Sequence, residues 1–156
     1  MSAPLLGTNA NGTGGFVALL ATAGGALSVA TVASAADAGL TGFRNTALTN
    51  VAVSLKNTAG NLYGLRVINP GANVAYVKLY NAPVANVNIG NAASTPLMVV
   101  QCGPSNNTTA GNVNVFPGFG PIRSFSAGIT ICATNALADS DTAAPVGTPY
   151  VEALYN

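Results

Sequence analysis

From about residue 45 onward the chain consists of short apolar segments, each ended by a cluster of glycine, proline or asparagine. Residues 57–61 (NTAGN) and 69–71 (NPG) are two such clusters. Proline and glycine supply the fixed and positive φ angles that tight turns require. The apolar segments are too short for typical helices, and none keeps a helical period. The pattern therefore predicts an all-β fold.

The segments with strand character follow one another at a spacing of about 8–12 residues, which is typical of sandwiches and jelly rolls. They are residues 51–56, 62–68, 74–80, 84–89, 96–101, 113–116, 122–125, 128–134 and 150–155. We expect a single β-sandwich or jelly-roll-like domain of about eight to nine antiparallel strands. The turn clusters at 57–61 and 69–71 predict that residues 51–80 form a three-stranded meander.

An uncharged segment precedes these strands, since residues 1–36 contain no charged side chain. It imitates a signal peptide but lacks the basic region that such peptides carry at their start. Residues 15–36 are long enough to cross a bilayer, yet glycine, serine and threonine dilute them and neither flank carries a Lys or Arg anchor. We predict an extended arm over residues 1–44 that lies against protein rather than membrane, and a β-sandwich domain over residues 45–156.

The scarcity of charge excludes several functions. Only 6% of the residues are charged, with five Lys or Arg, four Asp or Glu and no His. The commonest general base is therefore missing, and two cysteines cannot supply the four ligands of a usual zinc site. Five cations do not form the cluster that would neutralise roughly six to ten phosphates of a duplex. We predict no catalytic residue, no cofactor, no metal and no nucleic-acid partner.

Two residue pairs could carry chemistry, and each has a simpler explanation. Cys102 and Cys132 match no CxxC spacing, and we predict two buried thiols while leaving a disulfide open. Asp139 and Asp141 have a spacing found in calcium loops, but the other ligands of an EF-hand do not follow. We predict that these two carboxylates are solvated or cap a loop.

Large apolar and aromatic residues are the candidates for contacts with other proteins, because such side chains anchor interfaces. Tyrosines in or beside strands could be core or interface residues, and the sequence leaves both possibilities open. The bend at residues 117–121 would let Phe116 and Phe119 pack on opposite sides. The candidate contact residues are Phe16, Leu19, Leu20, Tyr63, Tyr76, Tyr80, Phe119 and Tyr155.

Four stretches of the domain resemble a group of virion structural proteins of tailed bacteriophages, among them small capsid cement and decoration proteins. They are residues 55–80 (LKNTAGNLYGLRVINPGANVAYVKLY), 125–134 (FSAGITICAT), 138–141 (ADSD) and 150–155 (YVEALY). The resemblance covers about residues 45–156 and does not include the arm. Its motifs are strands and turns, so it implies no active-site residue.

The resemblance implies a cement or decoration protein on the capsid surface of a virion, with the major capsid protein and further copies of this chain as partners. We expect a homo-oligomer, by analogy with capsid symmetry a trimer at three-fold positions, whose arm adds a strand to a neighbour's sheet edge. A tail, neck or fibre component is the alternative within a virion. A carbohydrate-binding module is the alternative of another class, because a sandwich with surface tyrosines is a common scaffold for one.

Overall fold

A computed structural model of the protein describes residues 19–21, 27–29, 39–106, 109–116 and 120–156. The chain divides into two compact units, Met1–Gly39 and Leu40–Asn156. In the first unit, the strands β1 (Leu19–Ala21) and β2 (Leu27–Val29) pair in antiparallel orientation. The second unit contains every other described element.

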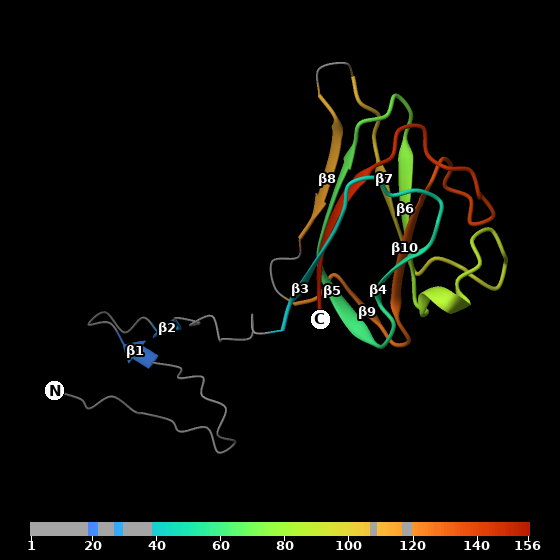
Figure 1. Cartoon of the computed structure of the whole chain (residues 1–156). Coiled ribbons are helices and arrows are strands. Elements are labelled where there is room, and N and C mark those ends of the chain that lie inside the picture. Colours follow the sequence, from blue (N-terminus) through green and yellow to red (C-terminus); the bar gives the residue numbers. More distant parts are fainter. Residues whose placement is uncertain (1–18, 22–26, 30–38, 107–108, 117–119) are drawn as a thin grey trace. The chain divides into compact units, whose positions relative to one another are not determined.

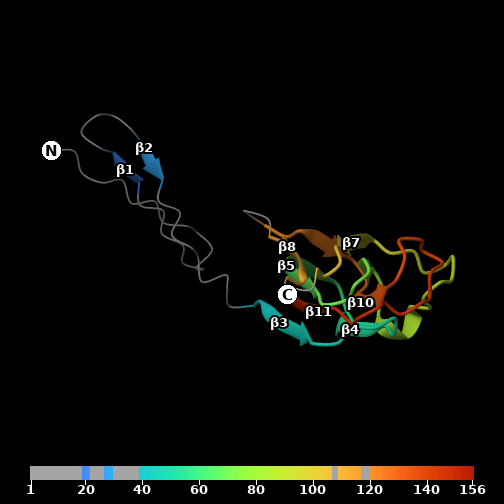
Figure 2. The same ribbon diagram turned by 90° about the horizontal axis from the view of Figure 1, so that it is seen from above.

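The second unit is a β-sandwich of two antiparallel sheets (Figures 1 and 2). One sheet has the strand order β4-β10-β6-β7, and the other has the order β3-β11-β5-β8, with β9 also paired to β5. The strands are β3 (Thr41–Asn45), β4 (Val53–Lys56), β5 (Gly60–Asn69), β6 (Ala75–Tyr80), β7 (Met98–Cys102), β8 (Gly111–Val115), β9 (Arg123–Phe125), β10 (Ile129–Thr134) and β11 (Tyr150–Tyr155). The predicted all-β sandwich of about eight to nine antiparallel strands is confirmed.

The strand β3 begins within the range that the sequence assigned to the arm, residues 1–44. It pairs along its whole length with β11, from Thr41 opposite Tyr155 to Asn45 opposite Val151. Backbone hydrogen bonds to a distant strand leave no local mark in the sequence. They place residues 41–44 in the sheet, so the compact unit begins at Leu40.

The core lies between the two sheets, where alternate side chains of each strand face inward. On β5 these include Leu65 and Val67, and on β6 they include Val77 and Leu79, all four of them 0% exposed. Burying one such side chain stabilises the fold by roughly 1.5–3 kcal/mol. The residue between two inward-facing neighbours, such as Arg66, therefore faces away from the core.

The predicted three-stranded meander over residues 51–80 is wrong. The strand β5 lies in the five-stranded sheet, whereas β4 and β6 both pair with β10 in the other sheet. The chain therefore crosses between the sheets at each of the two turns. Turn residues determine where a strand ends, but burial of both apolar faces decides which strand becomes its partner.

The predicted strand over residues 84–89 is also absent. A 3₁₀ helix, Val84–Asn86, follows Pro83 instead. The backbone N–H of Asn86 donates to the carbonyl of Pro83 at 2.9 Å, and that of Val87 donates to Val84 at 3.2 Å. These local bonds use the backbone groups that a strand would offer to a neighbour, and the alternation of apolar residues here is weak.

The two outer faces of the sandwich differ in how they are covered. On the four-stranded sheet, Lys78 is 0% exposed, and its Nζ donates to the carbonyl oxygen of Ala138 at 2.6 Å. Thr130 Oγ1 donates to the carbonyl oxygen of Ala82 at 2.7 Å. The loops that carry Ala82 and Ala138 therefore cover this face. The five-stranded sheet, by contrast, leaves large side chains such as Leu154 open to solvent.

Candidate interaction site

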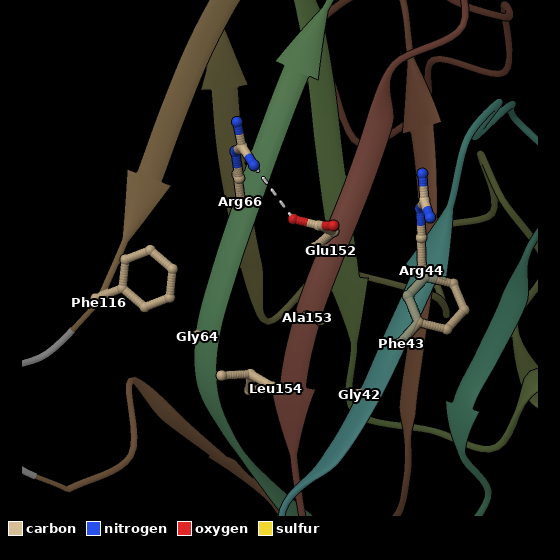
Figure 3. Close-up of a pocket in the computed structure, with 9 residues that line it drawn as sticks. All are labelled: Gly42, Phe43, Arg44, Gly64, Arg66, Phe116, Glu152, Ala153 and Leu154. Carbon is tan, nitrogen blue, oxygen red and sulfur yellow. Dashed lines mark hydrogen bonds and ion pairs between the residues drawn. The ribbon is translucent and has the colours of Figure 1, made fainter.

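The outer face of the five-stranded sheet contains a groove of about 420 Å³ (Figure 3). It lies over β3, β11 and β5. The ring of Phe116, the first residue after β8, lies beside it. The residues that line it are Gly42, Phe43, Arg44, Gly64, Arg66, Phe116, Glu152, Ala153 and Leu154. Adjacent strands supply all of these except Phe116, so the sheet itself is the floor of the groove.

An apolar row forms one part of the groove. The strand register places Leu154 between Gly42 on one side and Gly64 on the other. The ring of Phe116 lies over Gly64, because a Cβ atom added there would be only 2.7 Å from Phe116 Cε1. Two residues without side chains thus leave the groove hollow. Phe116 and Leu154 remain 60% and 42% exposed at its sides.

A charged row runs beside the apolar row, two residues later on β3 and β5 and two residues earlier on the antiparallel β11. Glu152 lies between Arg44 and Arg66 in the strand register. Arg66 Nη1 is 3.4 Å from Glu152 Oε2, and Tyr150 Oη donates a hydrogen bond to Glu152 Oε1. The guanidinium of Arg44 lies over the ring of Tyr150, 5.2 Å from its centroid, which is a cation–π arrangement.

These contacts shift the pKa values of Glu152 and Tyr150. The hydrogen bond from Tyr150, together with the charge of Arg66, holds the pKa of Glu152 below its usual value. The same hydrogen bond raises the pKa of Tyr150, because its hydroxyl proton is held by the carboxylate. The charged form of the Glu152 carboxyl group is therefore favoured at its place between the two arginine side chains.

The side chains that line the groove are mostly apolar or cationic. Glycine, alanine, leucine, phenylalanine, arginine and one glutamate line it, so it contains no nucleophile and only one carboxylate. That carboxylate is already hydrogen-bonded on both oxygens. What the arrangement offers is an exposed apolar surface next to guanidinium groups, which suits contact with another molecule.

The candidate contact residues of the arm have no described side-chain environment. Phe16 lies outside the described residues. In the domain, Phe119 and the packing predicted around it also lie outside them. Leu19 and Leu20 lie in β1, where they pair with residues of β2.

The four candidate tyrosines are described, and none of them lines the groove. Tyr80 is 1% exposed, so its ring packs inside the domain and not on a contact surface. Tyr63 and Tyr76 are half-buried, and the hydroxyl of Tyr63 accepts a hydrogen bond from Asn156 Nδ2 at 3.0 Å. Tyr155 is half-buried and packs against the core.

The residues that form the groove are not among those predicted from the sequence, although the sequence contains a signal for them. Residues 42–44 (GFR) and 64–66 (GLR) share the pattern glycine, apolar residue, arginine. In a strand, this pattern places a bare backbone and a guanidinium on one face and an apolar side chain on the other. Only the position of β11 between the two strands turns the repeat into a groove.

The two cysteines and the acidic loop are as predicted. Cys102 and Cys132 are free and buried, and burial raises the pKa of both thiols. Asp141 caps its loop, because its carboxylate accepts hydrogen bonds from the backbone N–H groups of Ala136 and Ala143. Among the described residues, no group of three or more His, Cys, Asp or Glu could hold a metal ion.

No helix in the described part of the chain is long and apolar enough to cross a membrane. Comparisons with protein families, with curated proteins and with solved structures found no match to this chain.

Proposed function

We propose that the protein is a structural virion protein, a cement or decoration protein that stabilises a phage capsid by bridging subunits of its shell. One observation carries the proposal: the apolar groove on the open face of the sandwich, with Phe116 and Leu154 exposed at its sides. The resemblance of the domain to phage virion proteins suggests capsid subunits as the partners of that surface. The partners are the major capsid protein and other copies of this chain, and the location is the capsid surface.

The composition supports permanent association. With 6% charged residues, few charged groups need to be desolvated when the surface is covered. Burying a fully exposed leucine or phenylalanine side chain contributes roughly 1.5–3 kcal/mol, and covering the exposed parts of Phe116 and Leu154 contributes a corresponding fraction of that. In a homo-oligomer several linked copies contact the shell at once, so weak individual contacts are sufficient for stable attachment. The uncharged arm would extend the contact across a neighbouring subunit.

The experiment compares binding of the purified protein to shells that lack it, followed by sedimentation and by the temperature at which the particles open. Leu154→Ser should reduce the number of bound copies and the thermal resistance of the particles. Val51→Ser is the matched control, because Val51 is 66% exposed and lies outside the groove. Equal binding of both variants, or no binding of the unaltered protein, contradicts the proposal.

A carbohydrate-binding module is a second candidate that one observation favours. Phe116, with 60% of its surface exposed, stands beside a row of arginine and glutamate side chains, and sugars bind to aromatic rings flanked by polar groups. A glycan array tests it. Glycan binding that disappears in Phe116→Ser would support this function.

A tail, neck or fibre component is the alternative within a virion. The number of copies per purified virion would distinguish it from a shell protein.

A further inference from the structure

We infer that the groove of one copy receives the loop at residues 137–139 of a second copy, with Leu137 against the apolar row and Asp139 against Arg44. The inference deepens the proposed function, because it names a second copy as the occupant of the same groove. It is argued from exposed apolar and charged side chains on two opposite sides of the domain.

Arg44 makes no ion pair among the described residues, although its charge acts on Glu152 and its guanidinium interacts with Tyr150. Glu152 is occupied by Arg66 and Tyr150, and within residues 39–106, 109–116 and 120–156 the Arg66–Glu152 contact is the only ion pair. The guanidinium of Arg44 is exposed and lies over the Tyr150 ring. A planar guanidinium held in this way presents donors in the geometry that a carboxylate accepts. The occupant should therefore bring a carboxylate next to an apolar side chain.

The chain offers few carboxylates for this role. Glu152 belongs to the groove itself, and Asp141 is used within its own loop. The first 36 residues of the arm are uncharged, and the residues two positions from Asp37 are an alanine and a glycine. Residues 1–36 could cover the apolar row but bring no carboxylate to Arg44, and no large apolar side chain stands two positions from Asp37.

The loop after β10 has the required combination. Leu137 is 58% exposed and Asp139 is exposed two residues later. The Asp139 carboxylate makes no hydrogen bond or ion pair with any described residue. Between them, the carbonyl of Ala138 accepts a hydrogen bond from buried Lys78, which ties the loop to the sheet beneath it. The loop is thus anchored in the middle and exposed on both sides.

The two surfaces lie on opposite sides of the domain. The loop covers the outer face of the four-stranded sheet, as the bond between Lys78 and Ala138 shows, whereas the groove is on the outer face of the other sheet. In Figures 1 and 2 the orange-red connection before β11 lies away from β3 and β8. One copy cannot fill its own groove with this loop. The contact must be head-to-tail between copies, which closes into a ring such as a trimer when the rotation allows it.

Charge reversal tests the pairing in the full-length protein. Arg44→Asp and Asp139→Arg should each weaken self-association by about tenfold in sedimentation velocity at increasing protein concentration. The double variant Arg44→Asp/Asp139→Arg should recover most of the lost affinity, because the pair is restored in every interface. Arg123→Asp is the control, since Arg123 is exposed, lies outside the groove and gives the same change in net charge.

Both positions are exposed, but Arg44→Asp places a second carboxylate opposite Glu152, so urea unfolding and circular dichroism are used to verify that every variant is folded under the assay conditions. A double variant that associates no better than the single variants overturns the inference, and so does an unaltered protein that stays monomeric at every concentration. Neither result affects the proposed function if the protein still binds shells. Loss of shell binding by an unaltered protein that self-associates would overturn the proposed function and leave this inference standing.

Discussion

Adding a single methyl group at Gly64 should reveal whether the ring of Phe116 rests on the sheet. A Cβ atom at Gly64 would lie 2.7 Å from Phe116 Cε1, 3.0 Å from its Cδ1 and 3.5 Å from Leu154 Cδ1. Carbon atoms in contact are normally about 3.5–4.0 Å apart, so the ring must move by roughly 1 Å. The matched control is Gly42→Ala on the other side of Leu154, because a Cβ atom at Gly42 would meet nothing within 4 Å.

The expected free energies follow from two opposing effects. Alanine in a strand interior is more stable than glycine by about 0.5–1 kcal/mol, and Gly42→Ala should gain this amount. Gly64→Ala gains the same amount but forces the ring of Phe116 away from its rotamer, which costs about 0.5–1.5 kcal/mol. The free energy of unfolding of Gly64→Ala should therefore stay close to that of the unaltered protein.

A double-mutant cycle separates the effect of the ring from the difference between a central and an edge strand. In a Phe116→Ala background no ring is displaced, so Gly64→Ala should raise the free energy of unfolding above that of Phe116→Ala alone. The coupling free energy between the two sites should therefore be about 0.5–1.5 kcal/mol. Urea unfolding followed by circular dichroism measures all four proteins. A coupling below about 0.3 kcal/mol, which is within the error of additivity, would refute the position of Phe116 over Gly64.

Two further predictions concern titration and reactivity. The pKa of Glu152 is lowered by Tyr150 and Arg66, so this stabilisation is present above the unfolded glutamate pKa of about 4.3 and is lost as pH falls through the lower folded value. Acid unfolding of Glu152→Gln should lack that part of the pH dependence, and an unchanged profile would contradict it. Cys102 and Cys132 should react with a thiol reagent only after unfolding, because both are 0% exposed and burial raises their pKa. Rapid modification of either thiol in the folded protein would be the contrary result.

The sequence predicted the strands well where apolar alternation lies between clear turn signals. The last strand, residues 150–155, and the segment around residues 75–80 were both located from the sequence. Where a strand begins and ends depends on residues that are close together along the chain, so it can be predicted from the sequence. The 3₁₀ helix after Pro83 was missed because the alternation is weak there and local hydrogen bonds decided the conformation.

The pairing of strands could not be predicted in the same way. The groove depends on β11 lying between β3 and β5, which brings Arg66 next to Glu152 across 86 residues of chain. Such pairing is set by the burial of whole sheet faces, and no short motif records it. Lys78 illustrates the same point: it alternates with core residues as a surface residue would, yet a loop covers it completely.

The sequence by itself determined that this protein is a sparsely charged β-structure without histidine, with five Lys or Arg and four Asp or Glu. The tertiary structure alone decided which of those charges are paired and which remain open. Glu152 and Arg66 satisfy one another, whereas Arg44 and Asp139 are left exposed on opposite sides of the sandwich. The reason is physical: composition fixes how many charges exist, but only the packing of distant strands and loops sets the distances between them.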